Sequence, residues 1–342
     1  MSMDFRQYVA SHSEEIYSKI MGYLPMREPT EHYKIVREYS ERRGSYRRPG
    51  LLMLTGQMFG AKIENLILPA AAMQLSEDWI LMHDDIEDDS ELRRGKPALH
   101  KIYGTPLAIN AGDAAHIAMW KMLKDNTDAV GIEIGDKLFE KFYDMLLYTV
   151  EGQYIETNFI YNTRSLADAN ENLYLRIVAS KTCYYTLYGP MQLGSIVAGQ
   201  RDEVQSILKE IGSPSGVAFQ IMDDVLDMTA DEKVFGKKRY GDLYEGKLTM
   251  IMLHAYQHST AAEKKKADSI YKKDRSEKTP EDIAFLSGLA DKYGSIDYAK
   301  AQAEKYGKLA IKALKKYDGF MPDNAYTEIF LSALEEMYKR HK

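Results

Sequence analysis

The sequence has little of what marks a secreted or membrane-spanning protein. Its 342 residues include one cysteine, Cys183, which cannot form an internal disulfide and fits a reducing compartment. No apolar core of a signal peptide stands near the N-terminus, so we expect no secretory signal. No stretch approaches the roughly 18 uninterrupted apolar residues of a membrane span, and the most apolar one carries Glu77 and Asp78 in its middle. These absences predict a soluble, cytoplasmic protein.

Strand signals are scarce as well. The chain has only ten prolines, most of them in expected loops, and no alternating apolar run of convincing length. Apolar residues recur instead at helical spacing in 137–159, 173–199 and 321–342. No linker rich in glycine, serine or proline divides the chain. We therefore predict a single all-α domain over residues 1–342.

The overall charge excludes one class of partner. The formal net charge is −6, and a mildly acidic balance gives no reason to expect nucleic acid. The lysine-rich segment 259–282 reads as a solvated helix and loop.

Acidic residues crowd into two short stretches. Residues 84–89 read Asp-Asp-Ile-Glu-Asp-Asp and residues 223–227 read Asp-Asp-Val-Leu-Asp, so both contain Asp-Asp-x-x-Asp after an apolar helical run. Residues four apart lie on one face of a helix, so Asp84 projects with Asp88, and Asp223 with Asp227. Like charges this close repel one another. The repetition favours a bound cation over a solvated acidic surface.

The ligands available in these stretches are hard carboxylate oxygens. His83 is the one imidazole nearby, and a lone histidine is more often packed in a helix than bound to metal. Carboxylates favour Mg²⁺ or Mn²⁺ over Zn²⁺, and Mg²⁺ bridges one or two carboxylates to substrate phosphates. Two facing clusters predict a site for several Mg²⁺ ions and one diphosphate. The candidate metal ligands are Asp84, Asp85, Asp88, Asp223, Asp224 and Asp227.

Fixed positive charge follows both acidic stretches, as a diphosphate site needs. Arg93 and Arg94 come after the first stretch, and Lys237 and Lys247 come after the second. Lys181 interrupts an apolar run. Its ammonium group either snorkels to the surface or reaches phosphate in a polar cavity.

Taken together, these motifs resemble the trans-isoprenyl diphosphate synthases, or polyprenyl synthetases. The resemblance runs from about Gly44 to Thr249. It includes DDIEDDSELRRG, the small-residue helix LAINAGDAAH, the Lys-Thr pair in SKT, GVAFQIMDDVLDM and FGKKRYGDLYEGKLT. Five motifs in this order make the match highly specific.

The resemblance implies a fold, a reaction and a set of roles. The fold is a bundle of a dozen or more helices around a deep cavity, usually a homodimer. The reaction ionises an allylic diphosphate, adds the cation to isopentenyl diphosphate and loses a proton. It uses Mg²⁺, expected as three ions, with Mn²⁺ as an alternative.

By this resemblance the direct metal ligands are Asp84, Asp88 and Asp223, with Asp85, Asp224 and Asp227 in support. The allylic diphosphate is held by Arg93, Lys181 and Lys237, assisted by Gln220, Thr182 and Lys247.

The pocket for isopentenyl diphosphate departs from the family pattern. Arg48 and Arg94 are retained, but Ser45 stands where the family has lysine, and Glu77 stands where it has histidine or glutamine. Three interpretations compete. In the first, Arg42, Arg43 or Arg47 compensates for the lost lysine, and Glu77 pairs with one of them. In the second, the chain is another ionising enzyme, such as a terpene cyclase. In the third, it is a non-catalytic subunit of a heteromer.

Product length is indicated by the residues before the first motif. In the resembled family the position five before the motif often limits the product, and here it is Trp79, the bulkiest side chain. Ile80 lies one helical turn before Asp84, and a turn of about 5.4 Å is comparable to one isoprene unit. We predict twenty-carbon geranylgeranyl diphosphate, with fifteen-carbon farnesyl diphosphate second; burial in the core is the alternative role of Trp79.

Overall fold

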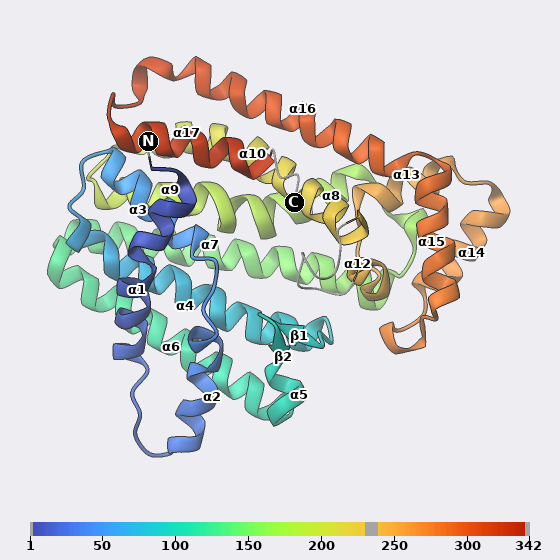
Figure 1. Cartoon of the computed structure of the whole chain (residues 1–342), viewed down its shortest axis with the longest axis horizontal. Helices are drawn as coiled ribbons and strands as arrows, with labels where there is room; N and C mark the ends of the chain where they lie inside the picture. The colour runs from blue at the N-terminus through green and yellow to red at the C-terminus, as the bar shows by residue number, and fades with distance from the viewer. Residues whose placement is uncertain (1–2, 230–238, 339–342) are drawn as a thin grey trace. The chain divides into compact units, whose positions relative to one another are not determined.

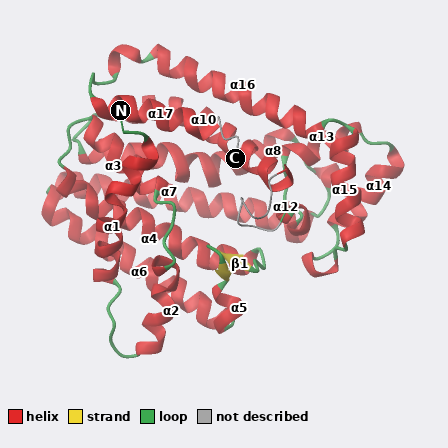
Figure 2. Cartoon of the chain, in the orientation of Figure 1, coloured by secondary structure: helices red, strands yellow, loops and turns green. Residues whose placement is uncertain are grey.

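The computed structural model describes residues 3–229 and 239–338. Helices make up nearly all of the regular structure in this part of the chain (Figures 1 and 2). The chain groups into two compact units. Unit 1 is drawn from Met1–Met145, Thr186–Lys209 and Tyr317–Leu334, and unit 2 from Leu146–Tyr185, Glu210–Lys316 and Glu335–Lys342. The predicted all-α class is confirmed, whereas the single domain and its deep cavity stay predictions.

Unit 1 begins with the N-terminal helices and a short hairpin. Its elements are α1 (Phe5–Tyr23), α2 (Thr30–Glu41), α3 (Arg47–Met58), α4 (Ile63–Glu87), β1 (Leu92–Arg93), β2 (Lys96–Pro97), α5 (Leu99–Tyr103), α6 (Thr105–Val130), the first half of α7 (Ile132–Asn158), α9 (Gly189–Val197), the start of α10 (Asp202–Thr229), η5 (Asp318–Phe320) and most of α17 (Ala325–Tyr338).

Unit 2 contains the second half of α7, most of α10 and the helices between them and after them. These are η1 (Phe159–Thr163), η2 (Leu166–Asp168), α8 (Glu171–Ile177), η3 (Val178–Tyr188, whose last residues belong to unit 1), α12 (Gly241–Glu245), α13 (Met250–His258), α14 (Ala261–Tyr271), η4 (Arg275–Glu277), α15 (Pro280–Lys292) and α16 (Ser295–Lys316).

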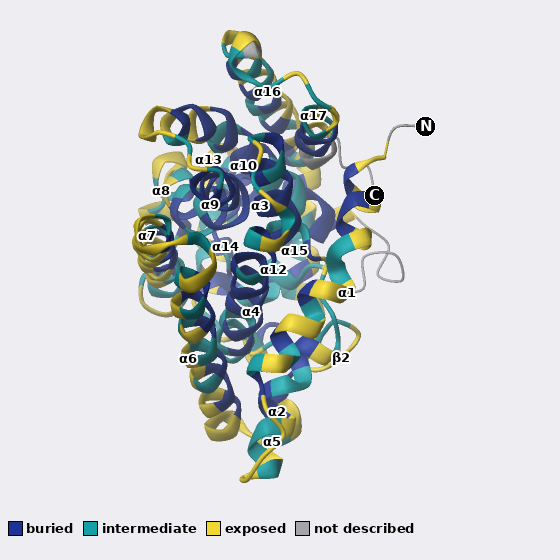
Figure 3. Cartoon of the chain, turned by 90° about the vertical axis from the view of Figure 1, so that its left-hand side faces the viewer, coloured by how far each residue is buried: buried dark blue, intermediate teal, exposed yellow. Residues whose placement is uncertain are grey.

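Helix α4 is the centre of unit 1. Its sequence is apolar nearly all round, so it is buried along most of its length (Figure 3). It packs on α6, α3 and α1. The helix emerges at its C-terminal end with the first aspartate stretch. Burial therefore fixes the direction from which these carboxylates project.

Close backbone contact joins α3 to α9 inside the same unit. A Cβ added at Gly194 would lie 2.1 Å from the carbonyl oxygen of Leu52 and 2.8 Å from the nitrogen of Gly56. No side chain fits there without moving the helices apart. Glycine at position 194 thus allows the core of unit 1 to close beside Arg48 at the start of α3.

Two local features depart from the predicted helices. A two-stranded antiparallel hairpin, β1 with β2, pairs Arg93 with Lys96 directly after the first aspartate stretch. The predicted helix over 173–199 forms as α8, η3 and α9, and η3 is a π-helix. Segments of π-helix occur frequently at functional sites. The hairpin and the π-helix carry Arg93 and Lys181 respectively.

Candidate active site

The first aspartate pair lies at the C-terminal end of α4. Asp88 is the C-cap, and its N–H donates to the carbonyl of Asp84 at 2.8 Å, so the two residues are one helical turn apart. Both side chains are half-buried. The predicted shared face is therefore confirmed by the helix geometry.

Asp85 points into unit 1 and holds an arginine. Its fully buried carboxylate accepts hydrogen bonds from Arg93 Nε at 2.9 and 3.1 Å, from Arg93 Nη2 and from the hydroxyl of Tyr39. Arg93 also lies 3.8 Å from Asp84. Asp85 thus fixes the guanidinium of Arg93 beside Asp84, and its supporting role in metal binding stays a prediction.

The second arginine of the hairpin is fixed by an aspartate that the sequence did not single out as functional. Arg94 Nη2 donates to Asp78 at 2.8 Å, and Nη1 donates to the carbonyl of Tyr39. Asp78 also accepts from Ser40 at 2.6 Å and from Gln74 at 3.1 Å. Burial raises the pKa of this carboxyl group. An acid inside the most apolar run of the chain is the signal that marks it.

Glu77 lies between the two arginines of the predicted isopentenyl diphosphate pocket. Its Oε2 is 3.1 Å from Arg48 Nη1, and its Oε1 is 3.8 Å from Arg94 Nη2. Arg48 also donates to Thr186 at 3.0 Å. Glu77, Asp78, Arg48 and Arg94 thus bring together two carboxyl groups and two guanidinium groups. Both pocket arginines are therefore already paired with carboxylates of this chain.

Two of the three arginines suggested as partners of Glu77 pair elsewhere. Arg42 instead donates to the carbonyls of Arg93 and Pro97 at 3.1 and 2.9 Å and pairs with Glu38. Arg43 pairs with Glu14 at 2.9 Å and lies over the ring of Tyr17. These bonds brace the hairpin and the surface, so Arg42 and Arg43 are committed elsewhere.

The two other residues expected near the pocket differ in exposure. Ser45 is exposed, whereas Arg47, the first residue of α3, is half-buried. Gly44 lies against the pocket, since a Cβ there would meet Arg94 Nη2 at 2.9 Å.

The second aspartate motif lies on α10 in unit 2, with Asp223 and Asp227 one turn apart. Between them Asp224 is buried and tied into a chain of hydrogen bonds. Gln220 donates to Asp224 at 2.9 Å and accepts from Thr182 at 2.7 Å, and the hydroxyl of Tyr174 donates to Asp224 at 2.9 Å. Burial raises the pKa of Asp224 to about 8. The predicted residues Thr182, Gln220 and Asp224 thus meet.

Lys181 is held in the π-helical segment of unit 2. Its Nζ donates to Glu156 Oε2 at 2.6 Å, and both side chains are largely buried. The ion pair argues against a lysine that merely snorkels to solvent, because its partner fixes it inside the unit.

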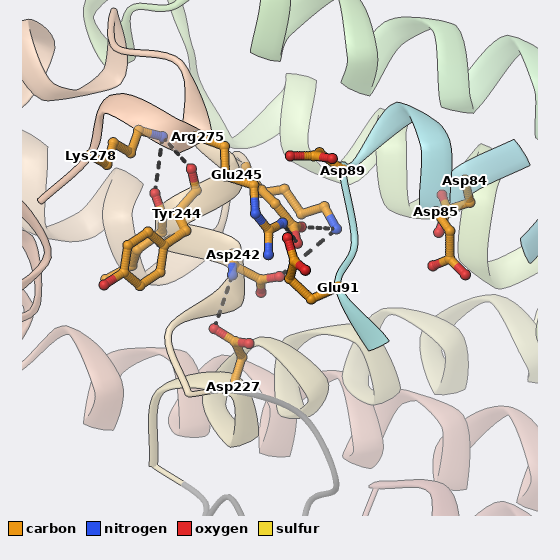
Figure 4. A network of polar contacts seen from close by, with 12 residues as sticks. Asp84, Asp85, Asp89, Glu91, Asp227, Asp242, Tyr244, Glu245, Arg275 and Lys278 are labelled. Carbon is orange, nitrogen blue, oxygen red and sulfur yellow. Dashed lines mark hydrogen bonds and ion pairs between the residues drawn. The ribbon is translucent and has the colours of Figure 1, made fainter. Parts of the chain in front are cut away.

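Helix α12 brings further charges to the second motif. The N–H of Asp242 donates to Asp227 Oδ2 at 3.2 Å (Figure 4). Lys247 lies 2.6 Å from Glu245 and 4.0 Å from Asp242. Burial, and next the charge of Asp227, raise the pKa of Asp242 well above its usual value. Asp242 and Glu245 lie inside the matched motif but were not selected from it. Lys237 lies outside the described residues.

Trp79 on α4 packs against the imidazole rings of His83 on α4 and His116 on α6. Its ring centroid lies 4.5 Å from that of His116 and 5.9 Å from that of His83. His116 accepts the indole N–H of Trp120 at 2.8 Å. The indole nitrogen of Trp79 is buried and has no hydrogen-bond partner among the described residues. Ile80, next to it, is half-buried.

The donor set suits Mg²⁺ brought in with a phosphate ligand. Among the described residues no three acidic, histidine or cysteine side chains are already gathered as a metal site. Mg²⁺ does not require such a cage, because it keeps several waters and binds one or two carboxylates plus substrate phosphates. The Asp84–Asp88 and Asp223–Asp227 faces offer oxygen donors of this kind.

No helix in the described part of the chain is long and apolar enough to cross a membrane.

Similarity to known proteins covers nearly the whole chain. The geranylgeranyl diphosphate synthase of Sulfolobus acidocaldarius is 31% identical over 312 residues, covering 91% of each chain. That of Methanosarcina mazei is 33% identical over 309 residues, covering 90% of each. The crystal structure of geranylgeranyl pyrophosphate synthetase from Pyrococcus horikoshii superposes with a TM-score of 0.84 at 29% identity, covering 98% of both chains.

The family model described as polyprenyl synthetase matches residues 29–286. This span includes the whole of the arginine pocket, both aspartate motifs and α12. The chain therefore belongs to the polyprenyl synthetase family of prenyltransferases.

Proposed function

We propose that this protein condenses isopentenyl diphosphate with an allylic diphosphate to make a short-chain trans-prenyl diphosphate, chiefly geranylgeranyl diphosphate. The observation that carries the proposal is the pair of aspartate faces, Asp84 with Asp88 and Asp223 with Asp227. Arg93 lies 3.8 Å from Asp84, and Lys181 is held by Glu156 in the same unit as the second face. The named relatives make geranylgeranyl diphosphate. The bulk of Trp79 before the first motif agrees with a product of that length.

In this proposal Asp84, Asp88 and Asp223 bind Mg²⁺, expected as three ions, while Asp85, Asp224 and Asp227 orient neighbouring groups. Bound Mg²⁺ neutralises the negative charge that builds on a departing diphosphate. The contacts of Asp85 with Arg93 and of Asp224 with Gln220 support this division of roles.

The cationic side chains bind and orient the allylic diphosphate. Arg93 and Lys181 are preorganised by Asp85 and Glu156, so they lose little freedom when phosphate arrives. Lys247, Thr182 and Gln220 assist, as Lys237 is expected to do. Fixed cations aimed at developing negative charge stabilise the transition state without reorganising.

The diphosphate itself takes the final proton, so no side-chain base is needed. Apolar residues such as Trp79 exclude water from the carbocation.

The ion pairs of Glu77 lead to a prediction about the second substrate. Glu77→Gln removes one negative charge beside Arg48 and Arg94 while keeping the side-chain volume. We expect isopentenyl diphosphate to bind about tenfold more tightly, since removing a like charge at this range is worth about 1.4 kcal/mol. Isothermal titration calorimetry of wild type and variant measures this directly.

The control for that titration is Glu14→Gln, which removes the exposed partner of Arg43 and should leave binding unchanged. Absence of binding by wild type together with no gain in Glu77→Gln would contradict the pocket assignment. It would favour a terpene-cyclase-like enzyme or a non-catalytic subunit, because Glu77 would then be closing the pocket.

We also infer a homodimer, from exposed apolar side chains on α6 and α7. In unit 1 these are Leu107, Ile109, Ile117, Ile132, Phe139 and Tyr143. Ile117 and Ile132 are 70% and 73% exposed, and exposed apolar side chains of this size are common where proteins interact. Light scattering should give about twice the 39.1 kDa of one chain; a mass of one chain would contradict the dimer.

Product analysis tests the proposed function. Purified protein is incubated with Mg²⁺, radiolabelled isopentenyl diphosphate and dimethylallyl, geranyl or farnesyl diphosphate, and the products are resolved by length. We expect the twenty-carbon diphosphate from each primer, with the fifteen-carbon product second from dimethylallyl and geranyl diphosphate. A main product of thirty carbons or more would contradict the short-chain assignment.

The cytoplasmic location inferred from the sequence stays a prediction.

A further inference from the structure

Lys278 is a buried lysine that the proposed reaction does not use. It lies in unit 2 between η4 and α15, and only 6% of its surface is exposed. Its Nζ donates to the carbonyl oxygens of Leu243 at 3.1 Å and Tyr244 at 2.8 Å (Figure 4). These carbonyls belong to the end of α12, where the partial charge is negative. Lysine is almost never buried unless it has partners such as these.

The main chain around Lys278 is fixed before the side chain reaches α12. A capping box joins Asp274 to Glu277 on its N-terminal side, and another joins Thr279 to Asp282 on its C-terminal side. Lys278 is the single residue between the two boxes. The fixed main chain therefore holds the ammonium group of Lys278 in place beside α12.

Two further contacts attach the same region to α12. Arg275 pairs with Glu245, and the hydroxyl of Tyr271 donates to the carbonyl of Lys247 at 3.2 Å. Gly246 follows α12 with a φ of +79°, and a Cβ there would lie 2.9 Å from Lys278 Nζ. Glycine at this position permits both the left-handed turn and the close approach of the ammonium group.

The opposite end of α12 touches the second aspartate motif. The N–H of Asp242 donates to the carboxylate of Asp227, and Tyr240 N–H donates to the carbonyl of Asp227 at 3.0 Å. Lys247, which the proposed function assigns to the diphosphate, leaves α12 through Gly246. One short helix thus connects Lys278 to two groups of the proposed site.

We propose that Lys278 is a positioning residue for the second aspartate motif: it fixes the C-terminal end of α12, and α12 holds the Asp227 carboxylate and Lys247 in place. Lys278 touches neither substrate nor metal in this account. The inference rests on the proposed function, because it gives α12 a role in binding Mg²⁺ and diphosphate.

Lys278→Met tests the proposal, since methionine keeps the length and apolar stem but loses the ammonium group. We expect the Mg²⁺ concentration for half-maximal activity to rise about tenfold, the effect typical of losing an outer contact of a metal site. The KM for the allylic diphosphate should rise with it, while circular dichroism stays the same. Lys292→Met is the matched control, because Lys292 lies on the adjacent α15 but pairs with Glu263 at 2.6 Å, outside the two capping boxes that flank Lys278.

A pH comparison with Lys278→Arg keeps the test decisive if Lys278→Met does not fold. Burial lowers the pKa of Lys278 to about 8, so its positive charge is present below that pH and is lost above it. The charged or titratable groups facing it are Glu245, Arg275, Arg164, Asp274 and Tyr271. From pH 7.5 to 9.5 the Mg²⁺ requirement of wild type should rise more than that of Lys278→Arg, whose guanidinium stays charged.

Two results would overturn the proposal. One is a folded Lys278→Met whose Mg²⁺ requirement and KM equal those of wild type. The other is an alkaline rise that Lys278→Arg shares in full, or that wild type does not show. Failure of the proposed function is distinguishable, because wild type would then incorporate no isopentenyl diphosphate at any Mg²⁺ concentration or pH.

Discussion

Replacing Asp84 or Asp223 by alanine should reduce kcat about a thousandfold while the helical fold remains. Each substitution removes one carboxylate expected to bind Mg²⁺, and losing about 4 kcal/mol of transition-state stabilisation corresponds to that factor. Asp84 lies in the last turn of α4 and Asp223 lies six residues before the end of α10, and both side chains are half-buried. Removing either one also relieves repulsion from neighbouring acids. Initial rates at saturating Mg²⁺, with circular dichroism as the folding check, measure the effect.

Asp89→Ala is the control for this prediction. Asp89 belongs to the same acidic stretch, but it is exposed and pairs with Lys101 at 2.6 Å. Its loss should change kcat little if the effect is specific to the aspartate faces. Near-native turnover in Asp84→Ala or Asp223→Ala would show that the two motifs do not act as proposed.

Trp79→Ala should shift the main product from twenty to at least twenty-five carbons. The indole packs against His116 and His83, and its buried N–H lacks a partner in the described part of the structure. Buried Trp N–H groups usually find a partner, so this side chain is poorly explained as core packing alone. Its removal frees about one helical turn of depth, roughly 5.4 Å. Adding Ile80→Ala should lengthen the product further.

Leu66→Ala separates chain-length control from general loosening of the core. Leu66 is buried on the same helix, far in sequence from the aspartates, and its side chain packs against Gly56. Truncating either Trp or Leu costs a few kcal/mol of stability, about 2–5, but only Trp79→Ala should lengthen the product. Trp79→Leu provides a milder variant if the alanine protein is unstable. An unchanged product distribution in both Trp79 variants would show that this residue does not limit the length of the product.

The helices and the shared faces of the aspartates were predictable because their signals are local. Asp84 and Asp88, or Asp223 and Asp227, share a face through spacing alone, whatever the tertiary structure. The apolar run before Asp84 likewise predicts a buried helix, and α4 is one. Family resemblance added roles that spacing does not supply.

The pairing of the pocket was not predictable, because it depends on contacts far apart in the sequence. Glu77 pairs with Arg48, 29 positions earlier, whereas Arg42 and Arg43, two of the candidates named for it, pair with other acids and carbonyls. Asp78 reads as an interruption of an apolar run until Arg94 is placed beside it.

Two backbone features were missed for a different reason. A hairpin with two residues in each strand is too short to show periodicity, although Gly95 in the turn, at φ +76°, is compatible with one. The π-helix at Val178–Tyr188 keeps the apolar pattern of an ordinary helix, so only its hydrogen bonding distinguishes it.

The most direct test of the central claim is incorporation of radiolabelled isopentenyl diphosphate by wild type, with geranyl diphosphate as primer, in Mg²⁺ and in EDTA. The account predicts that label enters a longer allylic diphosphate in Mg²⁺ and enters nothing in EDTA. Consumption of geranyl diphosphate in Mg²⁺ without any incorporated label, or no reaction at all, would contradict it.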